Sequence, residues 1–119
     1  MDPSFPIVIH HNPKCGTSRN VLAAIQDAGH VPEVIDYMTT GWTRGQLLGL
    51  FAAAGMTPRQ ALREKDPLAA ELGLLAADAD AEQIISAMVE HPVLVQRPIV
   101  ATPKGVKLCR PMELVTSLL

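Results

Sequence analysis

The sequence predicts a mixed α/β fold in a single domain covering residues 1–119. Two pairs of short β-branched segments support it, one near each end of the chain, and the N-terminal pair flanks an amphipathic helix. The composition agrees, because 48% hydrophobic and 18% charged residues in a chain of 119 can bury one core. Global disorder is therefore excluded.

The N-terminal part predicts a strand, a helix and a second strand. Ile7–Ile9 is a β-branched run that ends at the turn-forming segment His10–Pro13. Apolar residues then recur at helical spacing, with Ser18 as the expected N-cap and Gly29 ending the helix. The next strand is expected within Val31–Tyr37. A crossover of this kind makes the two strands parallel.

The middle of the chain, about residues 43–90, predicts a helical insertion. It is rich in Ala and Leu and is interrupted by Gly and Pro, which indicates three or four short helices. Thr43, Thr57 and Asp80 are the expected N-caps.

The C-terminal part predicts a hairpin and a helix. Pro98–Ala101 and Val106–Cys109 flank a turn at residues 103–105, and a helix is expected over Met112–Leu119, starting at Pro111. The resulting order, βαβ, helical insertion, ββα, is the outline of a thioredoxin-like fold with a mixed four-stranded sheet. Function has to be argued from the site that such a fold carries.

Charge and composition exclude several classes of partner. Ten Lys and Arg against twelve Asp and Glu give a net charge of −2, and aromatic residues make up only 3%. We therefore expect no nucleic-acid and no membrane partner. No apolar run could span a bilayer, and Met1–Pro6 contains Asp2 and two prolines instead of a basic leader, so a cytoplasmic protein is expected. Two cysteines are too few and too far apart for a disulfide scaffold or a four-ligand zinc site, and we expect neither a metal nor a bound cofactor.

Cys15 is the candidate nucleophile, because it lies between a strand end and a helix start. Helix N-termini stabilise anions, and a thiolate there has a lowered pKa. The same backbone amides can hold an oxyanion, and the neighbouring side chains add positive charge and hydroxyl groups. The residues expected to form this cradle are Lys14, Gly16, Thr17, Ser18 and Arg19. The alternative is an unreactive cysteine buried in a tight turn.

Two spacings narrow the reaction. The third residue after Cys15 is Ser18, so the Cys-x-x-Cys pair of a dithiol oxidoreductase is absent and the site is a monothiol. A cysteine-phosphatase loop would place Arg six residues after the cysteine, where this chain has Val21. Phosphatase chemistry is therefore not expected.

Three separated motifs resemble one family. The segments His11–Arg19 (HNPKCGTSR), Arg97–Val100 (RPIV) and Leu108–Pro111 (LCRP) are similar to those of the glutaredoxin- and glutathione-coupled arsenate reductases. The resemblance runs from the first strand to nearly the last residue. It implies a thioredoxin-like fold with a helical insertion. It also implies that a cysteine attacks arsenate and that three arginines hold the oxyanion, namely Cys15, Arg63, Arg97 and Arg110.

The resemblance also selects supporting residues, some of which have competitors nearby. It favours His11 over His10 as the histidine near the thiol and includes Asn12 among the residues that support the oxyanion site. It also makes Pro98 a candidate cis proline that faces the cysteine. Arg63 is favoured over Arg59, which lies one helical turn earlier, although either could be an ordinary surface arginine. Arg110 could likewise be a surface residue. The second cysteine, Cys109, is expected to face the core.

The mechanism implied by the resemblance needs two thiol partners. The thiolate of Cys15 displaces an oxygen of arsenate, glutathione acts as co-substrate on the thiol-bound arsenic(V), and glutaredoxin then allows arsenite to leave. Two alternatives stay open. One is an Spx-like regulator that binds RNA polymerase, often through a Cys-x-x-Cys switch that Ser18 argues against. The other is a related thiol oxidoreductase of unknown substrate.

Overall fold

The computed structural model describes residues 6–119. The first five residues, on which the expectation of a missing leader partly rests, lie outside this range. The chain divides into two compact units. The sheet unit comprises the residues up to Thr40 together with Arg97–Leu119, and the helical unit comprises Gly41–Gln96.

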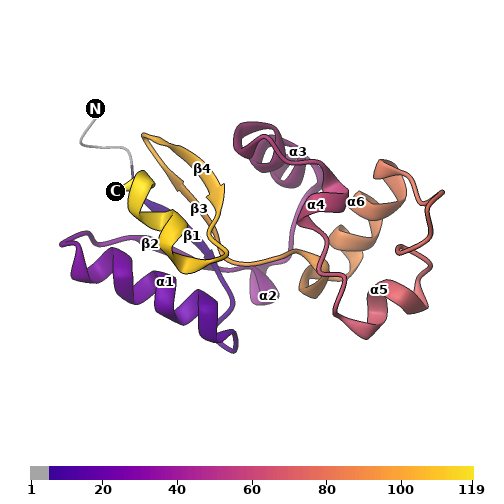
Figure 1. The fold of residues 1–119 in the computed structure, drawn as a ribbon, viewed down its shortest axis with the longest axis horizontal. Coiled ribbons are helices and arrows are strands. Elements are labelled where there is room, and N and C mark those ends of the chain that lie inside the picture. The colour runs from indigo at the N-terminus through magenta and orange to yellow at the C-terminus, as the bar shows by residue number, and fades with distance from the viewer. Residues whose placement is uncertain (1–5) are drawn as a thin grey trace. The chain divides into compact units, whose positions relative to one another are not determined.

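A four-stranded mixed sheet forms the centre of the sheet unit (Figure 1). Its strands lie in the order β2-β1-β3-β4. The pairing of β1 with β2 is parallel, whereas the β1–β3 and β3–β4 pairs are antiparallel. The strands are β1 (Val8–His11), β2 (Glu33–Asp36), β3 (Ile99–Thr102) and β4 (Gly105–Leu108). The thioredoxin-like order expected from the sequence is confirmed.

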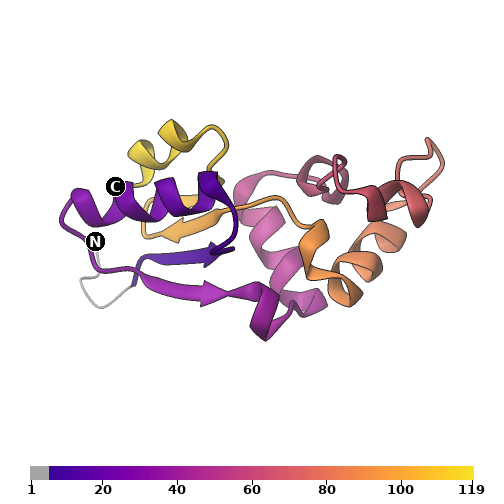
Figure 2. The same cartoon turned by 90° about the horizontal axis from the view of Figure 1, so that it is seen from below.

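The core of the sheet unit lies under two helices on one face of the sheet. Figure 2 shows α1 (Gly16–Asp27) and the C-terminal helix η2 (Met112–Leu118) on the same side of the strands. Ile9 and Val100 are paired across β1 and β3, and both are fully buried. They pack with Val21, Ile25, Cys109, Val115 and Leu118. Each buried aliphatic side chain of this kind contributes roughly 1.5–3 kcal/mol of burial free energy.

Helix α1 begins three residues earlier than the sequence suggests. Its N-cap is Cys15, with extended backbone dihedrals, so the prediction that Ser18 caps the helix is wrong. Ser18 lies inside the first turn and is fully buried. The far end agrees with expectation. Gly29 has a φ of 89° and donates its N–H to the carbonyl of Gln26, which closes the helix.

The C-terminal helix is a 3₁₀ helix instead of the α-helix that a helical pattern suggests. Its inward-facing residues Met112, Val115 and Leu118 are spaced by three. A 3₁₀ helix has three residues per turn, so this spacing places all three side chains on one line facing the core. Its backbone bonds from Leu114 to Pro111 and from Leu119 to Thr116 follow the same spacing.

The helical unit contains four α-helices and one 3₁₀ turn within residues 41–96. Three helices begin with complete capping boxes, formed by Thr43 with Gln46, Thr57 with Gln60 and Asp80 with Gln83, as the sequence predicts for the three N-caps. The elements are α3 (Arg44–Ala54), α4 (Pro58–Ala61), α5 (Pro67–Glu71), α6 (Ala81–Glu90) and η1 (Pro92–Leu94). The remaining short helix, α2 (Tyr37–Thr40), belongs to the sheet unit and shortens the second predicted strand.

The interior of the helical unit is apolar and is tied together by one arginine. Arg59 donates to the backbone carbonyls of Leu74, Ala76 and Ala79, at 3.4, 3.1 and 2.9 Å.

The helical unit begins and ends close to the expected insertion of about 43–90. That the whole chain behaves as a single domain stays a prediction. Over residues 6–119, none of the helices has the length and apolar character needed to cross a bilayer.

Candidate active site

Cys15 lies at the end of a tight loop between β1 and α1. Backbone N–H groups of the loop and of the first helical turn make several hydrogen bonds that hold it. The N–H of Cys15 donates to the carbonyl of Asn12 at 3.0 Å, the N–H of Lys14 donates to Asn12 Oδ1 at 3.0 Å, and the N–H of Arg19 donates to the carbonyl of Cys15 at 3.0 Å. Asn12 therefore shapes the loop from within it. The loop leaves Cys15 9% exposed.

Two of the three predicted arginines lie at this cysteine. Arg110 Nη1 is 3.8 Å from Cys15 Sγ and donates to the carbonyl of Arg97 at 3.0 Å. The Arg97 side chain is only 8% exposed, and its Nε and Nη1 have no hydrogen-bond partner within residues 6–119. Buried donors are normally satisfied. Arg97 therefore holds two buried donors whose hydrogen bonds the described residues do not satisfy.

The setting favours the thiolate form of Cys15. Burial raises the pKa of the thiol, but hydrogen bonds from Arg97 and from the backbone of Ser18, the charge of Arg97 and a hydrogen bond from Arg110 outweigh it and lower the pKa to about 7. Near neutral pH, a substantial fraction of Cys15 is thus ionised. Such a thiolate is a nucleophile that operates at physiological pH.

Pro98 follows Arg97 through a cis peptide bond, as expected. A second cis bond, between Arg110 and Pro111, was not anticipated from the sequence. The carbonyl of Pro98 accepts a hydrogen bond of 2.9 Å from the N–H of Cys109. The segments that carry Arg97 and Arg110 are therefore joined directly beside the cysteine.

Ser18 and His11 form a buried pair behind the loop. His11 Nδ1 and Ser18 Oγ are 2.7 Å apart, and the N–H of Asn12 donates to the same Ser18 oxygen at 3.1 Å. Burial and the charge of Arg19 lower the pKa of His11, and Asp36 opposes them. The hydrogen bond of His11 thus goes to Ser18 and supports the loop. Ser18 ties β1 to α1 at the position that a second cysteine occupies in dithiol enzymes.

The first turn of α1 presents an open face. A side chain at Gly16 would meet only Arg19 Nη2, at 3.8 Å, so the protein itself leaves this face free. Arg19 Nη1 donates to the carbonyl of Pro13 at 2.9 Å, which makes Arg19 a brace of the loop. The expected cradle of amides is only partly available to an oxyanion, because the N–H of Arg19 donates to the carbonyl of Cys15 and the backbone of Ser18 donates to its sulfur.

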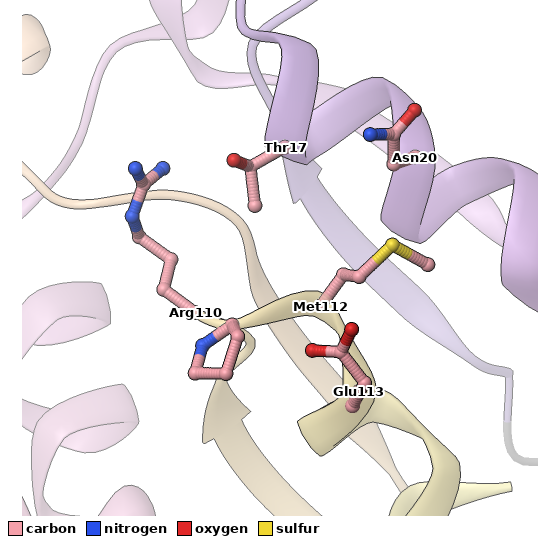
Figure 3. A pocket seen from close by; sticks show the side chains of 6 residues that line it. Thr17, Asn20, Arg110, Met112 and Glu113 are labelled. Carbon is pink, nitrogen blue, oxygen red and sulfur yellow. The ribbon is translucent and has the colours of Figure 1, made fainter.

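A pocket of about 390 Å³ lies beside Arg110. Figure 3 shows Thr17 and Asn20 on α1 facing the segment that follows β4. The pocket is lined by Thr17, Asn20, Arg110, Pro111, Met112 and Glu113. The sequence pointed to Thr17 and Arg110 but missed Asn20, Met112 and Glu113. Only the spacing of three between Thr17 and Asn20, which puts them on one helix face, could have suggested Asn20.

Arg63, the third predicted arginine, lies in the helical unit, after the end of α4. Its N–H donates to the carbonyl of Leu94 at 2.8 Å, and its Nη1 is 3.5 Å from Gln96 Oε1. Arg59, the competitor one helical turn earlier, donates to backbone carbonyls of its own unit. A role for Arg63 in the reaction stays a prediction.

The second cysteine is unsuited to redox partnership. Cys109 is fully buried in the core of the sheet unit, as expected. Burial raises its pKa to about 11, although the charge of Lys107 acts in the opposite direction. Cys109 is therefore a packing residue, and the site operates with one reactive thiol.

Comparisons with known proteins agree with this site. The model of the ArsC family matches residues 10–118. The chain is 63% identical to the arsenate reductase ArsI2 of Synechocystis over 95% of its own length and 81% of that protein. It is 49% identical to an arsenate reductase of Rhizobium meliloti and 47% identical to one of Escherichia coli, over 95% of this chain and 81% and 80% of those proteins.

A solved structure extends the agreement to three dimensions. The arsenate reductase of Vibrio cholerae superposes with a TM-score of 0.91 at 36% identity, over 97% of this chain and 98% of the other. The region matched by the ArsC family model, residues 10–118, contains the loop of Cys15 and both segments that carry Arg97 and Arg110. This chain belongs to the ArsC family.

Proposed function

We propose that this protein reduces arsenate to arsenite, with Cys15 as the nucleophile and with glutathione and glutaredoxin as the electron donors. The observation that carries the proposal is the pairing of an ionisable Cys15 with Arg97, whose buried Nε and Nη1 have no partner within residues 6–119. A thiolate and free guanidinium donors together fit a reaction between a sulfur nucleophile and an oxyanion. The relatives named as arsenate reductases support the choice of arsenate.

The first step joins two anions, so the protein has to cancel their repulsion. Arsenate is negatively charged at neutral pH, as is the thiolate of Cys15. Arg97, Arg110 and the N-terminus of α1 supply positive potential at the sulfur. The sulfur forms a bond to arsenic and one arsenate oxygen leaves as water, which gives a thiol-bound arsenic(V) ester without a change of oxidation state.

Two external thiols complete the reduction. The sulfur of glutathione bonds to arsenic and a second oxygen leaves as water. The thiolate of glutaredoxin then attacks the glutathione sulfur, a disulfide forms, and the electron pair of the sulfur–arsenic bond stays on arsenic, which becomes arsenic(III). Water releases arsenite from Cys15. The sum is one arsenate and two thiols giving one arsenite, one disulfide and one water.

An external donor is required because the reactive thiol has no partner in the described chain. Ser18 occupies the position of a resolving cysteine, and Cys109 is buried in the core. Neither can take part in a disulfide with Cys15 in the folded protein. We place the reaction in the cytoplasm, where a reduced thiol pool is maintained.

The test is a coupled assay in which NADPH oxidation is followed with glutathione, glutathione reductase and glutaredoxin. We expect oxidation that depends on arsenate and on both thiol donors, and that disappears with Cys15→Ser. Inactivity of the wild-type protein with arsenate, together with co-purification with RNA polymerase, would contradict the proposal and favour the regulator alternative.

A further inference from the structure

The pocket that Arg110 lines lies next to the reactive cysteine. It lies between α1, which contributes Thr17 and Asn20, and the segment after β4, which contributes Arg110 and Glu113 (Figure 3). Arg110 also lies 3.8 Å from Cys15 Sγ. The pocket and the nucleophile therefore share one wall. Its volume of about 390 Å³ falls within the roughly 300–1,000 Å³ typical of small-molecule sites.

Three polar side chains of this pocket, Thr17, Asn20 and Glu113, have no hydrogen-bond or ion-pair partner within residues 6–119, whereas Arg110 already donates from Nη1 to the carbonyl of Arg97. Arg110 and Glu113 carry opposite charges, but no ion pair joins them within the part of the chain that the structure describes. The side chains of Thr17 and Asn20 likewise make no hydrogen bond within residues 6–119. One anion, one hydroxyl and one amide thus line the same pocket without pairing with one another, and Arg110 lines the side nearest Cys15.

This set of groups does not match arsenate. The carboxylate of Glu113 would repel an inorganic oxyanion that entered the pocket, whereas Arg97 and the open turn of α1 offer positive potential without such a carboxylate. A ligand with an ammonium group would pair with Glu113, and a carboxylate on the same ligand could accept hydrogen bonds from Thr17 and Asn20. The pocket is therefore complementary to a zwitterion that approaches the thiol from one side.

We infer that this pocket binds the amino-acid end of the thiol co-substrate, a zwitterionic peptide thiol such as glutathione. The inference rests on the proposed function. Glu113 accepts hydrogen bonds from the ammonium group, and Asn20 and Thr17 donate to the carboxylate. A carboxylate near Thr17 is also favoured by the N-terminal end of α1.

The pocket positions the thiol for one bond exchange. In that step the sulfur of the peptide thiol bonds to the arsenic held by Cys15, and one arsenic–oxygen bond breaks. The oxygen leaves as water and takes up the proton of the thiol together with one from solvent. Arsenic stays in the pentavalent state. Glu113 and Asn20 are positioning residues in this scheme, because they hold the far end of the thiol and do not touch the reacting atoms.

Binding of S-methylglutathione, which cannot react, tests the inference directly. We expect the wild-type protein to bind it with amide shifts in NMR spectra confined to the pocket, and Glu113→Gln to weaken the affinity about tenfold, or about 1.4 kcal/mol. The matched control is Glu71→Gln, an exposed carboxylate on α5 in the helical unit, which should leave the affinity unchanged. With an N-acetylated probe, which lacks the ammonium group, Glu113→Gln should have no effect.

Steady-state kinetics give a second readout. Glu113→Gln should raise the KM for glutathione about tenfold, while the KM for arsenate and kcat at saturating glutathione stay unchanged. Equal affinity of wild-type and Glu113→Gln for S-methylglutathione, or no binding at the pocket, overturns the inference. If the probe binds as expected but arsenate is not reduced, the proposed function fails and the binding site stands.

Discussion

The two cysteines of this protein occupy opposite chemical settings within the same unit. Cys15 is the N-cap of α1 and is 9% exposed, whereas Cys109 is fully buried between the sheet and its covering helices. Burial raises the pKa of both thiols. Only at Cys15 do hydrogen bonds and positive charge reverse the effect, so its pKa is about 7, against about 11 for Cys109.

This comparison shows that donors around the sulfur matter more than its burial. Arg97 and Arg110 reach Cys15 from segments that are far from it in sequence, and the backbone of Ser18 adds a donor from the adjacent helix turn. Cys109 Sγ instead faces a backbone carbonyl, that of Lys107, at 3.7 Å. Burial without such donors raises the pKa of Cys109 and keeps the thiol protonated near neutral pH.

Replacing the two cysteines one at a time should give the largest difference in activity between variants. Cys15→Ser should lower kcat for arsenate reduction by at least about 10³-fold while leaving thermal unfolding nearly unchanged, because the nucleophile is lost. Cys109→Ala should retain activity and lose about 1–2 kcal/mol of stability, because a core cavity forms. Coupled assays and denaturant unfolding measure both. Appreciable turnover by Cys15→Ser would remove it from the nucleophile role.

Replacing a hydrogen-bond donor at Cys15 should give the next largest loss of activity. Arg97→Lys should lower kcat/KM for arsenate about 10²-fold, since an ammonium cannot reproduce the planar fork of the guanidinium. Its matched control is Arg44→Lys in the exposed ion pair with Glu82 in the helical unit, which should leave the rate unchanged. Equal rates for Arg97→Lys and the wild-type protein would remove Arg97 from the site.

The predicted third arginine can be separated from its neighbour by the same assay. Arg63→Lys should lower kcat/KM about tenfold if Arg63 contributes to oxyanion binding. Arg59→Lys should instead reduce stability with little change in rate, because Arg59 holds the carbonyls of Ala76 and Ala79. A rate loss confined to Arg59→Lys would reverse the assignment made from the family pattern.

The support behind the loop should give the smallest effect on the rate. Ser18→Ala removes the partner of His11 Nδ1 and of the Asn12 N–H, both of which are buried. We expect a loss of about 1–3 kcal/mol in stability and a rate reduction of only a few-fold. A rate loss as large as that of Arg97→Lys would mean that Ser18 acts on the reaction itself.

Local patterns predicted most of the fold, because each was strong by itself. The β-branched runs, the three capping residues and Gly29 are signals that act over a few residues, and the structure agrees with them. The start of α1 was missed because Ser18 resembles a cap by type, yet its hydroxyl is used by His11 and Asn12 instead. The 3₁₀ form of the last helix depends on its packing against the core, which local propensity does not contain.

The site was predictable only in part. The position of Cys15 at a helix start follows from sequence order, but its proximity to Arg97 and Arg110 came from the family resemblance and depends on the chain path through β3 and β4. Glu113 carries no signal in the sequence, and Asn20 is indicated only by its spacing of three from Thr17. They meet in one pocket because α1 and the segment after β4 cover the same face of the sheet.

Titration of the Cys15 thiol tests the central claim most directly. In the Cys109→Ala variant, the rate of alkylation by iodoacetamide should be measured from about pH 5 to about pH 10, with Arg97→Lys in the same background as comparison. Because the thiolate is the reacting form, the rate should rise with pH through a midpoint of about 7 and shift to higher pH in the Arg97→Lys protein. A midpoint at the ordinary value of a free cysteine, unchanged by Arg97→Lys, would contradict the account.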